Sequence, residues 1–370
     1  MRIRKHLESL PAYTPIEPFE VLSARIGRSP TEIVKLDANE NPYSPLPVVR
    51  EALGSMEFPH IYPDPESRAL RRSLEEFTGV RAEYLLAGSG ADELLDLLMR
   101  IFLEPEDCIL SCPPTFGMYS FDAELNAARC LEVPRHADFS LDMDGIRKAV
   151  ATYRPKLIFI TSPNNPDGSL LDKATVDALL NLPTLIVLDE AYIEFAGENL
   201  GASLSRIREV PQRENLIVLR TFSKWAGLAG LRVGYGAFPR WLMPTLWKSK
   251  QPYNVNVAAS VAAQVSLEHV EELTKVVELL KSERERLLKE LQNIPYLRLY
   301  PTQSNFILCR VIGRDAAELK ATLAEEHGVF IRYFNKPGLR DHIRISVGRP
   351  QDTDVLLKAL KSESKSPDFE

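Results

Sequence analysis

Short apolar runs recur along this chain and constrain its fold more than any other feature. They cover residues 84–87, 108–111, 157–161, 185–189, 216–219 and 233–237. Most are apolar throughout rather than alternating with polar residues, which is typical of strands that are covered on both faces. Helical stretches lie between many of them. The succession predicts an α/β domain with a mostly parallel central sheet flanked by helices.

The pattern changes after the last of these runs. A long charged helical stretch covers residues 256–291, and a smaller α+β unit follows it. We predict an N-terminal arm with part of a small domain over residues 1–35, and a large domain over 36–255. The helix over 256–291 then connects to a small C-terminal domain over 292–362 and a disordered tail over 363–370. We expect the proline-rich start to run as an extended arm.

The composition excludes several classes of protein. The chain has 370 residues and a net charge of −6, and it contains no basic block, which argues against nucleic acid as a partner. No apolar stretch is long enough to cross a membrane, and the N-terminus lacks the apolar core of a secretory signal, so we expect a cytoplasmic protein. The scattered cysteines and histidines show no metal-binding spacing, so we expect no metal site.

Polar residues follow the apolar runs, and functional groups in open α/β sheets gather at the carboxyl ends of strands. The first run leads into Ala87-Gly-Ser-Gly-Ala-Asp-Glu93, a glycine-rich turn that feeds a helix and suits a phosphate group. A strand-to-helix turn needs glycines in any case, and this one is not the G-x-G-x-x-G of dinucleotide folds. Another run ends at Asp189, where burial would favour the neutral acid unless a cation lies nearby. A helix cap would also account for Asp189.

Lys224 lies in a loop of small residues soon after the run 216–219, although lysine is among the side chains least often buried. A lysine at a desolvated strand end has a lowered pKa and becomes a nucleophile able to form a Schiff base. Taken singly, a surface salt bridge is the simpler explanation. Other residues near the strand ends change this interpretation: a phosphate cradle, an aromatic residue, an asparagine, an acid and an arginine. Together they match what pyridoxal phosphate requires.

These motifs resemble those of the fold-type I pyridoxal-phosphate aminotransferases, and within them the histidinol-phosphate aminotransferase family. The most specific stretches are Asp189-Glu-Ala-Tyr-Ile-Glu-Phe195 and the Ser-Lys…Gly-Leu-Arg segment over 220–234. Supporting stretches run through nearly the whole chain in the family's order, among them 36–43, Tyr62-Pro-Asp64, 114–119 and 162–166. The resemblance implies a large cofactor-binding domain, a small α+β domain and pyridoxal 5′-phosphate as the cofactor.

The resemblance also implies catalytic and cofactor-binding roles for individual residues. Lys224 would bind the cofactor's aldehyde and move a proton, Asp189 would pair with the pyridine nitrogen, and Tyr192 would assist at the ring. The remaining cofactor contacts would be Asn165 with Tyr192 at the phenolic oxygen, Phe116 on the ring face, and Ala91, Asp92, Ser223 and Arg232 at the phosphate.

Further residues would contact the partner subunit's cofactor or the substrate. Tyr62 would reach the cofactor phosphate across the boundary of a homodimer with shared active sites. Tyr13, Arg332 and Arg344 would meet the substrate's own phosphate or carboxylate. Arginine in a strand such as 343–347 would point away from its isoleucine neighbours, although solvated edge-strand charges would explain both arginines as well.

The implied activity is transfer of an amino group between L-histidinol phosphate and 2-oxoglutarate, a step of histidine and therefore amino-acid biosynthesis. The chain departs from the family's commoner residues at Phe116, Asp167 and Trp225. These departures leave the substrate preference open. Aromatic amino-acid aminotransferases and threonine-phosphate decarboxylase share most of these motifs and stay as alternatives. A pyridoxal-phosphate-binding regulatory module is a non-enzymatic alternative, and the lack of a helix-turn-helix extension counts against it.

Overall fold

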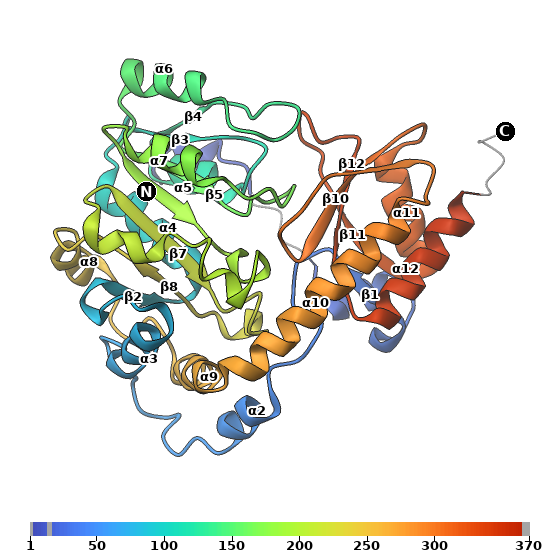
Figure 1. The fold of residues 1–370 in the computed structure, drawn as a ribbon, viewed down its shortest axis with the longest axis horizontal. Helices are drawn as coiled ribbons and strands as arrows, with labels where there is room; N and C mark the ends of the chain where they lie inside the picture. The colour runs from blue at the N-terminus through green and yellow to red at the C-terminus, as the bar shows by residue number, and fades with distance from the viewer. Residues whose placement is uncertain (1–2, 13–16, 365–370) are drawn as a thin grey trace.

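The structure of this protein is a computed structural model that describes residues 3–12 and 17–364. Tyr13 and most of the tail predicted over 363–370 lie outside these described residues. Two sheets organise the rest of the chain, and each is covered by its own helices (Figure 1).

The larger sheet has seven strands in the order β2-β8-β7-β6-β5-β3-β4. Their bounds are Leu85–Gly88 (β2), Cys108–Ser111 (β3), Arg129–Glu132 (β4), Leu157–Thr161 (β5), Leu185–Asp189 (β6), Leu216–Thr221 (β7) and Gly234–Ala237 (β8). The strands pair in parallel except β8, which is antiparallel to both β2 and β7. The predicted α/β fold with a mostly parallel sheet is confirmed. The apolar pattern did not reveal β4, because exposed Arg129 and Glu132 bound this edge strand.

Successive residues of the central strands point into two different cores. On β6, Ile186 and Leu188 lie in one core, and Leu185 and Val187 lie in the other. The first core is covered by α2 (Pro47–Gly54), α3 (Arg68–Thr78), α6 (Met143–Tyr153), α7 (Lys173–Leu180) and α9 (Val257–Glu268), and the second by α4 (Gly90–Phe102), α5 (Met118–Leu125) and α8 (Met243–Ser249). Burial on both faces explains why these strands are continuous apolar runs.

The smaller sheet has five strands in the order β1-β11-β12-β10-β9. Their bounds are Val34–Leu36 (β1), Leu297–Leu299 (β9), Phe306–Val311 (β10), Val329–Tyr333 (β11) and His342–Ser346 (β12). Helices α10 (Val270–Leu291), α11 (Ala316–His327) and α12 (Pro350–Glu363) cover one face, where Ile343 and Ile345 are buried. Because β1 pairs in parallel with β11, the N-terminal and C-terminal parts of the chain share this sheet.

One local expectation is wrong. Residues 256–291 form two helices rather than one, because His269 leaves the helical conformation with φ −113° and ψ 36°. Helix α9 packs on α2 and α3, whereas α10 continues to the small sheet (Figure 1). The extended proline-rich start stays a prediction: Pro11 and Pro18 lie in non-helical backbone between a 3-10 turn at Lys5–Glu8 and helix α1 (Phe19–Ile26), and Pro15 lies outside the described residues. The domain boundaries stay predictions.

Several connections contain short 3-10 helices, namely Pro30–Glu32, Ala82–Tyr84, Ile193–Phe195, Asn199–Gly201, Ile207–Gln212 and Ala229–Leu231. The last of these lies between Lys224 and β8, where it shapes the loop that carries the lysine. None of the described helices is both long and apolar enough to cross a bilayer.

Candidate active site

Three parallel strands of the large sheet end side by side at the candidate site. Thr161 at the end of β5 pairs in register with Asp189 at the end of β6, and Asp189 pairs with Leu219 on β7. Strand β7 runs on to Thr221, and Lys224 lies in the loop that follows. The fold therefore brings the predicted acid and the predicted lysine to one edge of the sheet.

Asp189 is buried, with only 4% of its surface exposed, and it is held from two sides. Its Oδ2 accepts a hydrogen bond of 2.7 Å from the Tyr119 hydroxyl, and its Oδ1 accepts one of 3.1 Å from the Ala191 N–H. Burial raises the pKa of the Asp189 carboxyl to about 6, although both hydrogen bonds act to lower it. A cation placed beside this carboxyl would favour its ionised form, so the site suits a protonated ring nitrogen.

Tyr119 and Thr161 are site residues that the sequence analysis did not assign. The buried Tyr119 hydroxyl donates to Asp189 and lies 2.7 Å from the Thr161 Oγ1. Phe116, the predicted ring-stacking residue, packs edge-on against Tyr119 with ring centroids 5.6 Å apart. The stretch 114–119 had pointed to this part of the chain, but only the packing of α5 shows that Tyr119 joins Phe116 to Asp189.

Lys224 has the surroundings of a nucleophile. Its Nζ donates a hydrogen bond of 3.3 Å to the Ala38 carbonyl oxygen. Burial and, next, the positive charge of Arg344 lower the pKa of the Lys224 amine to about 8. A sizeable fraction of the amine is therefore neutral at mildly alkaline pH, and only the neutral amine attacks an aldehyde.

The predicted phosphate-binding residues meet at the start of α4. Arg232 donates to Ser223 Oγ over 3.3 Å and to Asp92 Oδ2 over 2.9 Å. Gly90 has a φ of +78°, a conformation that favours glycine, and a Cβ there would lie 2.4 Å from a nitrogen of the Arg232 guanidinium, so a larger residue would displace that side chain. The backbone N–H groups at Ala91 and Asp92 begin this helix and, with Arg232, form a cradle that suits a phosphate.

Tyr192 and Asn165 are each held by a residue from a distant part of the chain. The Tyr192 oxygen accepts a hydrogen bond of 3.0 Å from the Asn39 amide, and Asn165 Oδ1 accepts one of 2.5 Å from the Arg344 guanidinium. Asn39 was not predicted as a site residue, although it lies in the stretch 36–43 that supports the resemblance. Both predicted partners of the phenolic oxygen are thus linked to residues outside the large sheet.

Arg332 on β11 and Arg344 on β12 pair in register in the small sheet. Arg344 is buried, donates to the Asp37 carbonyl oxygen over 2.9 Å, and faces away from Ile343, as the alternation along the strand predicts. Arg332 is half-buried, and its guanidinium lies 5.9 Å from the centroid of the Phe334 ring. The structure brings Arg344 to the site, and Arg332 lies beside it.

Tyr62 lies elsewhere on the surface. It is 80% exposed and stacks on Tyr253, with ring centroids 4.6 Å apart. Phe58 and Ile61 in the same segment are also more than half exposed, at 59% and 53%. An exposed aromatic stack beside other apolar side chains is what a residue that serves a neighbouring subunit would present.

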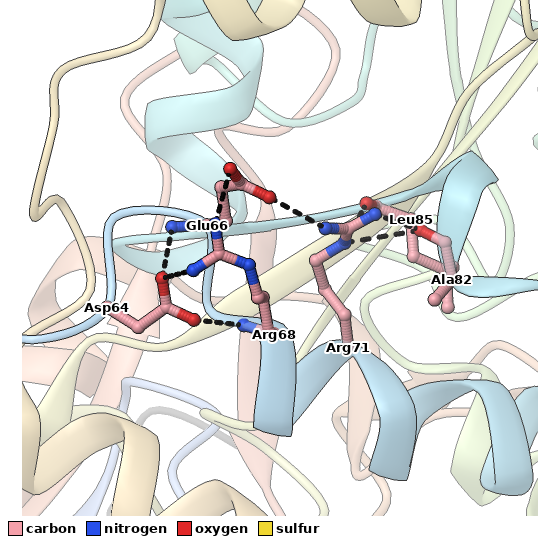
Figure 2. Close-up of polar contacts among 6 residues, drawn as sticks. All are labelled: Asp64, Glu66, Arg68, Arg71, Ala82 and Leu85. Atoms are coloured by element: carbon pink, nitrogen blue, oxygen red, sulfur yellow. Dashed lines mark hydrogen bonds and ion pairs between the residues drawn. The ribbon is translucent and has the colours of Figure 1, made fainter.

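The chain just after Tyr62 is fixed to the large sheet by the polar contacts in Figure 2. Asp64 accepts hydrogen bonds from the backbone N–H and the guanidinium of Arg68, at 2.8 and 2.7 Å. Arg71 donates to the Leu85 carbonyl oxygen over 3.0 Å and also to that of Ala82. Tyr62 is therefore attached to an anchored segment rather than to a loose loop.

Among the described residues, one group of possible metal ligands exists, and it lies away from this site. Glu326, His327 and Glu363 on α11 and α12 have ligand atoms within 4.8 Å of one another. Glu363 already forms ion-pair contacts with Arg314 at 3.2 Å and His327 at 3.3 Å. Glu363 and His327 therefore already contact each other between two outer helices of the small sheet.

The residues at the carboxyl ends of β5, β6 and β7 suit a pyridoxal-phosphate enzyme, and comparison with known proteins agrees with this. The family model for aminotransferase class I and II matches residues 31–360. The chain belongs to this family, whose members use pyridoxal phosphate and share the fold-type I architecture. Asp189, Lys224 and the cradle at Arg232 fit that cofactor.

Particular relatives narrow the resemblance further. The chain is 57% identical over 360 residues to a chloroplastic histidinol-phosphate aminotransferase of Nicotiana plumbaginifolia, covering 97% of this chain and 86% of the relative. It is 49% identical to a histidinol-phosphate aminotransferase of Roseiflexus castenholzii, covering 97% of each. The crystal structure of a histidinol-phosphate aminotransferase from Sinorhizobium meliloti with pyridoxal 5′-phosphate superposes with a TM-score of 0.89 at 28% identity, covering 99% of this chain and 98% of that one.

The cytoplasmic location expected from the sequence needs correction. The Nicotiana relative, more than half identical to this chain, is named as chloroplastic. The expectation rested on the lack of an apolar secretory signal, which bears on export alone and does not discriminate between the cytoplasm and an organelle.

Proposed function

We infer that this aminotransferase moves the amino group between L-histidinol phosphate and 2-oxoglutarate, and so acts in histidine biosynthesis. The names of relatives at 57% and 49% identity support this reaction. The single observation that carries it is structural: Lys224 and Asp189 share one sheet edge, and buried Arg344 is close enough to lower the pKa of Lys224. An amine and a substrate anion are thereby held within reach of one cofactor.

We propose roles for the residues of the large sheet. When bound, pyridoxal phosphate supplies an aldehyde that condenses with amines and a ring that withdraws electrons from the substrate. Lys224 Nζ holds the aldehyde carbon and moves the proton at the substrate Cα, and the Asp189 carboxylate holds a proton on the ring nitrogen. The other contacts are those of Tyr192 and Asn165 with the phenolic oxygen, Phe116 with the ring face, and Ala91, Asp92, Ser223 and Arg232 with the phosphate.

The substrates require a site that accepts two kinds of anion. Histidinol phosphate carries a phosphate and glutamate carries carboxylates, and a guanidinium binds either with two parallel hydrogen bonds. We assign Arg344 to the anionic group nearest the reacting carbon, because it already donates to Asn165. Arg332 and Tyr13 would contact the more distant part of the substrate.

Half-reaction spectra test this function most simply. Purified protein with its cofactor is mixed in turn with histidinol phosphate, phenylalanine, tyrosine and threonine phosphate, and the absorption of the cofactor is followed. We expect the fastest conversion to the amine form with histidinol phosphate, reversed by 2-oxoglutarate. Faster conversion with an aromatic amino acid, or release of carbon dioxide from threonine phosphate, would favour the corresponding alternative.

We also propose a homodimer in which Tyr62 contacts the cofactor phosphate of the partner subunit. The exposed stack of Tyr62 on Tyr253 supports this arrangement. Mixing Lys224→Ala with an impaired Tyr62 variant should form hybrid dimers that contain one unimpaired site and regain activity. If subunit exchange is verified by mass and no activity returns, the role across the boundary is wrong.

A further inference from the structure

The segment Asp37-Ala38-Asn39, which directly follows β1, contacts proposed site residues from both sheets. The Asp37 carbonyl oxygen accepts from Arg344 over 2.9 Å, and the Ala38 carbonyl oxygen accepts from Lys224 over 3.3 Å. The Asn39 side-chain amide donates to the Tyr192 oxygen over 3.0 Å. No role had been assigned to this segment, although it lies within the stretch 36–43.

Asn39 is fixed in place by residues of the small sheet. Its backbone N–H donates to Ser346 Oγ over 2.8 Å, and its carbonyl oxygen accepts from the Asn305 amide over 3.0 Å. Its φ is +55°, a conformation in which asparagine is enriched and β-branched residues are rare. Asn39 is only 1% exposed, so few of these contacts compete with water. Ser346 lies on β12, the strand that carries Arg344.

These contacts determine which atom of the Asn39 amide faces Tyr192. The Ser346 hydroxyl accepts from the Asn39 backbone, and its own hydrogen is donated to Asn39 Oδ1 over 3.1 Å. The other end of the amide, Nδ2, therefore faces the phenol and can only donate. Since the Tyr192 oxygen accepts this bond, its hydrogen cannot point at Asn39 and must be donated elsewhere.

We propose that Asn39 is a positioning residue that directs the phenolic hydrogen of Tyr192 toward the cofactor and ties this orientation to β12. The proposal rests on the proposed role of Tyr192 at the cofactor's phenolic oxygen. A hydrogen bond received by the Tyr192 oxygen also makes its O–H a better donor, because linked hydrogen bonds polarise one another. Asn39 would thus stabilise the ionised phenolic oxygen of the bound cofactor.

Two substitutions test this without straining the backbone. Asn39→Gly keeps the positive φ and removes the donor without adding charge, and Asn39→Asp keeps the shape but can only accept, so it takes the phenolic hydrogen for itself. Asn215→Gly is the control, because the Asn215 amide donates to the Leu180 carbonyl at the opposite end of the strands. Each protein is prepared with its cofactor, and its visible absorption is titrated with pH.

We expect Asn39→Gly to raise the pH midpoint of the visible absorption by about 0.5–1 unit, as for the loss of one hydrogen bond, and Asn39→Asp to raise it at least as far. In a Tyr192→Phe background Asn39→Gly should add nothing, since Asn39 acts through that phenol. An unchanged midpoint in Asn39→Gly, or a shift that persists without the phenol, overturns the proposal alone. A Tyr192→Phe protein with an unshifted midpoint overturns the proposed role of Tyr192 together with it.

Discussion

The edge of the large sheet and the face of the small sheet opposite its helices contribute different groups to one site. At the large sheet, Asp189 and Lys224 follow parallel strands whose residues are buried in two cores. At the small sheet, Arg332 and Arg344 stand on neighbouring strands, and Arg344 reaches across to Asn165. In the proposed function, the large sheet places the groups that act on every substrate, whereas the small sheet places two arginines that bind the anionic groups of the substrates.

The two regions are not independent of each other. The charge of Arg344 is the second cause of the lowered pKa of Lys224, after burial. A change at the small sheet should therefore have two effects, one on substrate binding and one on the lysine. Changes at the large sheet should affect all substrates alike.

Lys224→Ala should give the largest effect. Without the amine, the proton at the substrate Cα has no base, and the loss should be at least about 10²- to 10⁴-fold in kcat for both histidinol phosphate and glutamate. Steady-state rates measure it, with Lys173→Ala as the matched control, because the Lys173 side chain is exposed at the start of α7. A variant that spared one of the two substrates would contradict the division between the sheets.

Asp189→Asn should follow, with a fall of about a hundredfold or more in kcat and an intact fold. An amide cannot supply the negative charge that keeps the ring nitrogen protonated. Circular dichroism checks the fold, and single-turnover spectra check the chemistry with each substrate. Turnover near that of the wild type would reduce Asp189 to a helix cap.

The variants Arg344→Lys and Arg332→Lys should distinguish the roles of the two arginines in substrate binding. Replacing a fork of donors by a point charge should lower kcat/KM about ten- to a hundredfold where the arginine binds substrate. We expect Arg344→Lys to affect histidinol phosphate and glutamate together, and Arg332→Lys to affect mainly histidinol phosphate. Equal small losses in both variants would leave the small sheet without a role in specificity.

The smallest effect concerns the pH dependence of Lys224. In protein stripped of its cofactor, the rate of cofactor uptake should rise with pH through a midpoint near 8, because the amine is protonated and unreactive below its pKa. Arg344→Gln removes a positive charge and should move the midpoint upward, whereas Arg340→Gln at the exposed loop before β12 should leave it in place. An unmoved midpoint in Arg344→Gln would mean that the charge of Arg344 does not contribute to this pKa.

Much of the large sheet could be predicted because burial on both faces leaves a continuous apolar signal in the sequence. Asp189 and Lys224 stood out for the same reason, since each is a polar residue close to the end of such a run. The direction of β8 was less accessible: the loop from 222 to 233 contains no α-helix, yet its length would also permit a parallel crossover.

The partners of these residues could not be predicted. Tyr119 lies 70 positions from Asp189, and Asn39 lies 153 positions from Tyr192, so their contacts depend on how α5 and the segment after β1 pack. The break at His269 has no glycine or proline to signal it. The local sequence pattern thus predicted which residues form the candidate site. The hydrogen-bond partners that hold those residues in place depend on tertiary packing.

The central claim, that Lys224 carries the cofactor, is tested most directly by reduction and peptide mapping. Purified protein is treated with borohydride, digested, and its peptides are searched by mass for a reduced pyridoxyl group. We predict that the visible absorption disappears and that the modified lysine is Lys224. A modification at another lysine, or a protein that takes up no pyridoxal phosphate at all, would contradict the account.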